Sequence, residues 1–64
     1  MDAAWEYLVD QTLREVEPDI VERTRIRRRL HDSGELGMMF STWKQGGQDE
    51  AVKRILTRLA EQQR

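Results

Sequence analysis

Apolar side chains recur every three or four residues in four separate segments of this chain, which is the spacing of one face of an α-helix. The alternation of apolar and polar residues that marks a half-buried strand is absent from the sequence, and β-branched residues do not cluster. The pattern therefore predicts an all-α fold. We expect a single compact four-helix bundle over residues 1–64, because a chain of 64 residues is too short for two cores.

The four predicted helices cover residues 3–15, 18–31, 35–44 and 49–62. Asp2 suits the N-cap of the first helix, where its carboxylate can accept hydrogen bonds from free backbone N–H groups. Pro18 suits the first position of the second helix, where a missing N–H costs nothing. The connections are short, so we expect consecutive helices to pack as neighbours, mostly antiparallel.

The corner between the second and third helices has two interpretations. Asp32 and Glu35 have the spacing of a capping box, with Asp32 as the N-cap of the third helix. Alternatively, Gly34 closes the second helix from the position just after its C-cap. Both interpretations predict a tight corner at residues 31–34.

The second helix has a divided apolar pattern. Ile20 and Val21 lie on one side of it, and Ile26 and Leu30 lie on another. This division predicts either a bend in the helix or two sides that are covered by different neighbours.

A domain of this size has little apolar surface to bury, so its stability should be marginal and association could supplement it. Nine large side chains are expected to form one contiguous core: Trp5, Leu8, Leu13, Leu36, Phe40, Trp43, Ile55, Leu56 and Leu59.

Several kinds of chemistry have no basis in the sequence. There is no cysteine and only one histidine, His31, so we expect no disulfide, no metal site and no cofactor. The glycines match no phosphate-binding motif, and no paired catalytic groups are evident, so we expect no enzymatic activity. No apolar run is long enough to span a membrane and no signal peptide is evident, which predicts a cytoplasmic location without a membrane partner.

The charges are sorted along the chain. Residues 1–22 carry seven acids and one base, a balance of −6, whereas residues 23–64 carry ten bases and five acids, a balance of +5. Five of these bases are arginines within seven residues: Arg23, Arg25, Arg27, Arg28 and Arg29. A dipolar molecule of this kind can bind its own copies head to tail, or a relative with matching surfaces.

The arginine cluster has three interpretations. It could be a solvated helix face, a phosphate-binding surface for nucleic acid, or a surface that pairs with the carboxylates of another protein. A helix-turn-helix needs polar side chains on its second helix to contact base edges, but residues 35–43 are nearly all apolar. We therefore favour a protein partner and keep a small nucleic-acid-binding domain as the alternative. A third possibility is a structural bundle that dimerises through Met38, Met39 and Trp43.

The order of these features resembles the first four helices of the death-fold superfamily, and within it the caspase recruitment domains. An acidic first helix leads to a second helix that starts at a proline, then to a Ser-Gly corner, a short third helix, a glycine break and a fourth helix. The motifs that carry the resemblance, over residues 4–60, are Trp5-x-Tyr7-Leu8-Val9, Glu17-Pro18-Asp19-Ile20, Leu30-His31-Asp32-Ser33-Gly34-Glu35-Leu36, Gly46-Gly47 and Ala51-Val52-x-x-Ile55-Leu56-x-x-Leu59.

The resemblance implies a function and a set of contact residues. Caspase recruitment domains are six-helix bundles that assemble innate-immune and cell-death complexes through contacts between acidic and basic surfaces. The last two helices have no counterpart here, so the four present must close a core alone or be completed by another chain. By position, the resemblance assigns protein-binding residues to an acidic surface of Asp10, Glu17 and Asp19 and to a basic surface of Arg14, Arg23, Arg27 and Arg28.

Overall fold

Four helices account for most of the computed structural model, which describes residues 2–64. They are α1 (Ala3–Val16), α2 (Ile20–Asp32), α3 (Glu35–Lys44) and α4 (Asp49–Gln62), and none of the residues described lies in a strand. The predicted all-α, four-helix bundle is confirmed, with overall dimensions of 30 × 22 × 21 Å.

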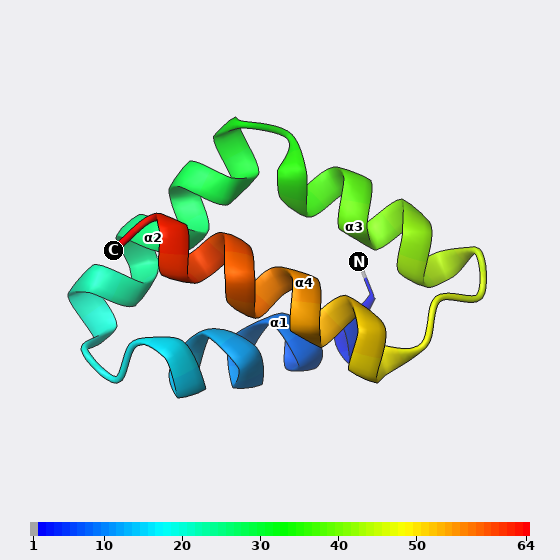
Figure 1. Ribbon diagram of the computed structural model, residues 1–64, viewed down its shortest axis with the longest axis horizontal. Coiled ribbons are helices and arrows are strands. Elements are labelled where there is room, and N and C mark those ends of the chain that lie inside the picture. Colours follow the sequence, from blue (N-terminus) through cyan, green and yellow to red (C-terminus); the bar gives the residue numbers. More distant parts are fainter. Residues whose placement is uncertain (1) are drawn as a thin grey trace.

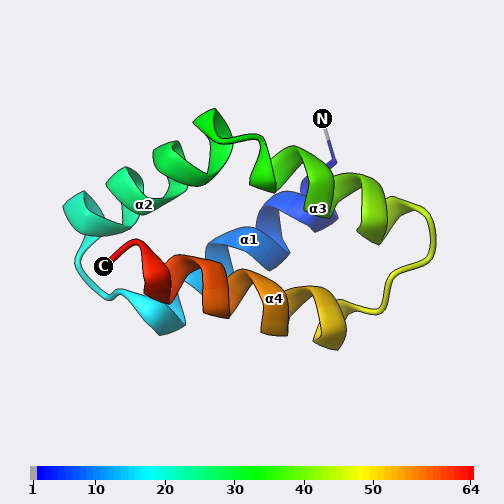
Figure 2. The same ribbon diagram turned by 45° about the horizontal axis from the view of Figure 1, so that its top comes forward.

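The first and last helices form the centre of the packing. α1 makes its largest interface with α4, and the two helices run side by side in the same direction (Figures 1 and 2). α2 and α3 cover the other side of α1 and α4. They follow one another in the same general direction after a bend, whereas α1–α2 and α3–α4 reverse direction (Figures 1 and 2). The C-terminal end of α4 therefore lies beside the corner that joins α1 to α2.

Carboxylates begin the first two helices. Asp2 caps α1 as predicted, accepting hydrogen bonds from the backbone N–H groups of Ala4 at 3.0 Å and Trp5 at 3.2 Å. The predicted start of the second helix at Pro18 is wrong. Asp19 is the N-cap of α2 and accepts a hydrogen bond from the N–H of Glu22 at 3.2 Å, so Pro18 precedes the cap. A carboxylate satisfies a free N–H at this position, which proline cannot do.

Gly34 makes the corner between α2 and α3. Its φ of 85° lies in the left-handed region, which glycine enters without the steric penalty of a side chain. α2 extends through Asp32, and Gly34 follows its C-cap, Ser33. The interpretation of Gly34 as the end of the second helix is therefore confirmed, and the capping box is wrong. The Glu35 carboxylate instead accepts a hydrogen bond of 2.7 Å from the Ser33 hydroxyl.

The core is continuous and draws on all four helices. Its buried side chains are Trp5, Val9, Leu13, Ile26, Leu30, Leu36, Met39, Val52, Leu56 and Ala60. Leu8, Val16, Phe40, Trp43 and Leu59 pack against it and are partly buried. The prediction of Ile55 as a core residue is wrong, since it is 51% exposed. The buried stripe of α4 runs through Val52, Leu56 and Ala60, four residues apart, and Ile55 falls outside it.

The divided apolar pattern of α2 was predicted to mean a bend in the helix or two covered sides. Only one side of α2 is covered. Ile26 and Leu30 are buried, whereas Ile20 and Val21 are 65% and 63% exposed. One side of α2 therefore faces the core and the other carries uncovered apolar side chains at its N-terminal end.

Candidate interaction surface

Two of the predicted contact residues neutralise each other on α1. Nε of Arg14 lies 3.2 Å from Oδ2 of Asp10, one helical turn away, and both side chains are largely exposed. The structure thus joins a residue of the predicted acidic surface to one of the predicted basic surface. Exposed pairs of this type contribute little free energy, so either group remains open to a partner.

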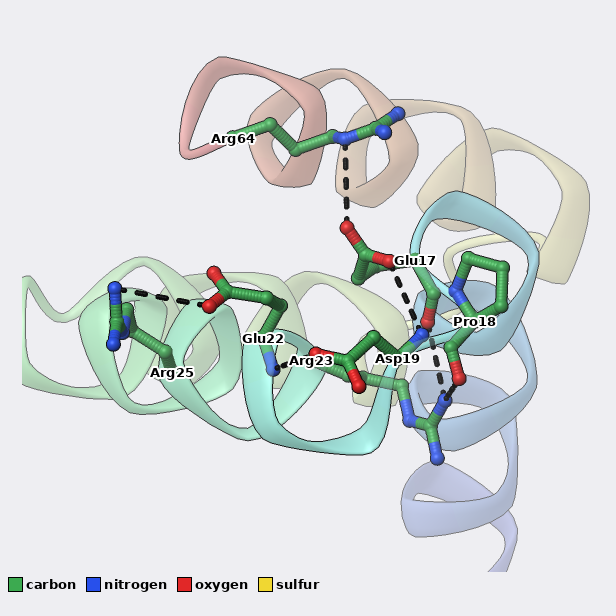
Figure 3. Close-up of polar contacts among 7 residues, drawn as sticks. All are labelled: Glu17, Pro18, Asp19, Glu22, Arg23, Arg25 and Arg64. Carbon is green, nitrogen blue, oxygen red and sulfur yellow. Dashed lines mark hydrogen bonds and ion pairs between the residues drawn. The ribbon is translucent and has the colours of Figure 1, made fainter.

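Three further predicted residues meet at the corner between α1 and α2 (Figure 3). Glu17 accepts a hydrogen bond of 3.1 Å from the backbone N–H of Asp19, and its other carboxylate oxygen lies 3.7 Å from Nε of Arg64. The guanidinium of Arg23 donates to the carbonyl oxygens of Glu17 and Pro18, each at 3.1 Å. Glu17 and Arg23 therefore hold the corner together, and are less available to a partner than the sequence analysis predicted.

Bases from other helices pair with the remaining acids of α1. Arg27 on α2 forms an ion pair with Glu6, and Nζ of Lys53 on α4 lies 2.9 Å from a carboxylate oxygen of Glu15. The hydrogen bond to Glu15 raises the pKa of Lys53 above its ordinary value of 10.5. Desolvation opposes this rise, and the negative charges of Glu15 and Glu50 add to it.

All seven acids between residues 2 and 22 therefore have a partner in the chain. Asp2 and Asp19 cap helices, and the other five form ion pairs, the longest being Glu22 with Arg25 at 3.8 Å. The sorted charges of the sequence are largely compensated when the chain folds.

Four exposed arginines have no carboxylate partner among the described residues. Within residues 2–64, no carboxylate lies within ion-pair distance of Arg28 and Arg29 on α2 or of Arg54 and Arg58 on α4, and all four are exposed. Arg28, one of the predicted contact residues, is therefore free to bind an anion. Arg29 belongs to the predicted arginine cluster but was not among the predicted contact residues. Arg54 and Arg58 were not predicted at all, because sequence does not show which bases pair internally.

Arg28 also lines a groove of about 500 Å³ between α1, α2 and α3, which we call the aromatic groove. Its lining includes the apolar residues Trp5, Leu36 and Phe40 together with Gly37. The polar and charged residues of the lining are Asp2, Glu6, Thr24, Arg27, Arg28 and His31. An apolar surface beside an unpaired guanidinium is suited to bind a partner in which an apolar side chain lies close to a carboxylate.

An aromatic cluster makes the apolar side rigid. The ring centroid of Trp5 lies 5.6 Å from that of Phe40 and 5.5 Å from that of Trp43, and Phe40 and Trp43 are 6.3 Å apart. These distances are typical of favourable aromatic pairs. These three residues were predicted as core residues, but the groove was not predicted. It lies where α1, α2 and α3 meet, and Gly37 contributes no side chain to it.

His31 and Ser33 make local contacts near the corner between α2 and α3. Between residues 2 and 64, no group of carboxylates and histidine is arranged to hold a metal ion. His31 is exposed, with Nδ1 3.4 Å from the neighbouring Asp32 carboxylate, and the Ser33 hydroxyl donates to Glu35 and Leu30. None of α1–α4 has the length and apolar content needed to span a bilayer.

Comparisons of this chain with protein-family models, with curated proteins and with solved structures find no significant match.

Proposed function

We propose that this chain is a non-enzymatic protein-interaction module that binds a second copy or a related helical domain through complementary charged surfaces. The observation that supports this best is Arg28. Its guanidinium is exposed, lacks an internal carboxylate partner and borders the aromatic groove. Arginine favours bidentate pairing with carboxylates, and arginine and aromatic side chains are enriched at protein interfaces.

The acidic half of the proposed contact is the exposed part of the predicted acidic surface. Asp10 and Asp19 remain accessible, one in a solvent-exposed pair with Arg14 and one as a helix cap. Because exposed ion pairs are weak, an arginine of a partner can replace Arg14 at little cost. Glu17 is excluded from this surface because its side chain is only 16% exposed.

The death-fold resemblance is part of the same proposal. It rests on the order of sequence motifs, and it suggests an adaptor or signalling module in the cytoplasm.

Nucleic-acid binding is the second candidate, because four unpaired arginines also suit phosphate groups. The exposed side chains of α3 argue against nucleic-acid binding through this helix. Gly37, Met38, Ser41 and Thr42 offer few side chains that could contact base edges.

The test is the molecular mass of the protein as a function of concentration, measured by sedimentation equilibrium at low and at physiological salt. A short DNA duplex and a single-stranded RNA of mixed sequence are added in parallel. We expect association of the protein with itself or with a purified helical partner, and no nucleic-acid binding at physiological salt.

Charge reversal identifies the surface that is used. Arg28→Glu with Arg29→Glu should abolish association, whereas the matched pair Arg54→Glu with Arg58→Glu on α4 should not. Circular dichroism should show the same helix content in both, since these side chains are exposed. Nucleic-acid binding at physiological salt without any protein association would establish the second candidate instead.

A further inference from the structure

Tyr7 on α1 carries the most exposed aromatic side chain of the described chain, at 68%. It lines a second groove of about 500 Å³, which lies between α1 and α4 where the two helices run side by side (Figures 1 and 2). We call it the Tyr7 groove, and its other apolar lining residues are Ala4, Leu8 and Trp43. Tyrosine and tryptophan are enriched at protein interfaces, so this groove is a candidate binding surface.

Two carboxylates at the start of α4, those of Asp49 and Glu50, also line the Tyr7 groove, and both residues are exposed. Within residues 2–64, no lysine or arginine lies within ion-pair distance of either carboxylate. Arg54 follows Glu50 by one helical turn, but no ion pair joins them. The fold therefore leaves two negative charges unpaired at the edge of an aromatic groove.

Lys53 is the one basic residue that lines the described groove, and it already has a partner. Its Nζ lies 2.9 Å from a carboxylate oxygen of Glu15. The carboxylates of Glu15, Asp49 and Glu50 together with the Lys53 ammonium give a formal charge of −2. A groove that is apolar, aromatic and negative suits a side chain with an apolar stem and a positive charge.

We propose that the Tyr7 groove binds a basic peptide segment of another protein, with a lysine or arginine side chain between Tyr7 and the carboxylates of Asp49 and Glu50. Charge complementarity identifies this occupant. The faces of aromatic rings attract cations, and carboxylates accept charge-assisted hydrogen bonds from them.

This inference goes beyond the proposed function, because it adds a site with the opposite charge preference. The proposed function uses the unpaired Arg28, which borders the aromatic groove and suits an acidic surface. No residue lines both grooves. The chain can therefore hold an acidic partner and a basic segment at the same time.

The size of the Tyr7 groove indicates a short occupant. Its wall on α1 extends from Ala4 to Gln11, which is two helical turns or about 10 Å. About three residues of an extended peptide cover the same length. A peptide of this size should bind with a dissociation constant of about 1 mM or somewhat below.

The experiment is an NMR titration of the isotope-labelled full chain with the capped peptide Gly-Lys-Leu-Lys-Gly. The matched control peptide carries Nζ-acetyl-lysine in place of each lysine, which keeps the alkyl stem and removes the charge. The signals to follow are the backbone amides of the groove residues and the indole N–H of Trp43. We expect saturable shifts with the lysine peptide and an affinity at least about fivefold lower for the acetylated peptide.

Two variants of the groove should each weaken peptide binding at least about fivefold. Glu50→Lys places a like charge beside the peptide, and its matched control is Glu61→Lys, an exposed residue of the same helix outside the groove. Tyr7→Ala removes the aromatic face, and its matched control is Met38→Ala on α3, which is 73% exposed. The controls should change the dissociation constant less than about twofold. Circular dichroism checks that each variant is folded, and Glu50→Gln replaces Glu50→Lys if the reversal loses helix content.

Three results would overturn the inference: no saturable shift at about 5 mM peptide, equal affinity for the two peptides, or shifts centred outside the Tyr7 groove. If no peptide binds and Tyr7→Ala instead weakens association of the protein with itself, the occupant is a second copy and the basic-peptide site is wrong.

The proposed function fails on a different measurement. Arg28→Glu with Arg29→Glu tests association and should change the dissociation constant of the peptide less than about twofold at physiological salt, where distant charges are screened. Unchanged association in that variant contradicts the proposed function and leaves the Tyr7 groove standing. Loss of peptide binding alone contradicts only the groove.

Discussion

The indole N–H of Trp43 donates a hydrogen bond of 2.8 Å to a carboxylate oxygen of Asp49. The bond spans the turn between α3 and α4, where Gly46 has a φ of 104°. It links the aromatic cluster to the first turn of α4, so a single side chain supports both the groove and the start of the last helix.

Asp49→Ala is expected to lower the free energy of unfolding by about 1 kcal/mol, because it removes this hydrogen bond and a favourable charge at the start of α4. Asp49→Asn retains an oxygen acceptor and should cost less. Urea unfolding followed by circular dichroism provides the comparison. Equal stabilities for the parent and the alanine variant would show that the bond adds nothing in solution.

Gly34 and Gly37 should respond to alanine with opposite signs. Gly34→Ala places a side chain in the left-handed region and should destabilise the protein by about 1–2 kcal/mol. Gly37 lies within α3 and has open space around it, so Gly37→Ala should stabilise by about 0.5–1 kcal/mol. Thermal unfolding of the two variants, side by side, tests both the corner and the helix assignment.

Leu30→Ala is expected to lower the free energy of unfolding by about 2–5 kcal/mol. The leucine side chain is completely buried, so its removal leaves a cavity. Ile55→Ala deletes an aliphatic side chain of equal size that is half-exposed, and it should cost well under half as much. Denaturant unfolding gives both values. A large loss at Ile55 would mean that α4 is rotated relative to the structure described above.

The Glu15–Lys53 pair should make the stability of the folded protein depend on pH. Because the pKa of Lys53 is raised in the folded state, protonated Lys53 favours the fold. Its contribution is complete below the ordinary value of 10.5 and is lost as the pH rises through the folded-state value. The difference in unfolding temperature between the parent and Lys53→Gln should therefore be larger at neutral pH than at about pH 11.5. A constant difference between the parent and Lys53→Gln would argue against the pair.

The helices were predictable because apolar spacing and capping chemistry are local. Asp2, Gly34 and the turn at residues 46–47 mark boundaries that depend on a few neighbouring residues. The start of α2 was misplaced because proline and aspartate both favour helix N-termini, and only the hydrogen bond from Glu22 to Asp19 distinguishes them.

The interaction surface was harder to predict because its character depends on pairs that are distant in sequence. Lys53 and Glu15 are 38 residues apart, and Arg27 and Glu6 are 21 apart. The sequence showed which residues are charged, but not that the fold compensates Glu6 and Glu15 and leaves Arg28 unpaired. The groove likewise depends on how α1, α2 and α3 meet, which no local pattern specifies.

The packing of α1 against α4 has a consequence for synthesis on the ribosome. The apolar face of α1, with Trp5, Val9 and Leu13, leaves the exit tunnel well before its main cover, which is the stripe from Val52 to Ala60. Until that stripe emerges, the nascent chain exposes a large apolar face that binding by a chaperone could protect. The core can therefore close only after α4 has emerged, and the apolar face of α1 stays uncovered until then.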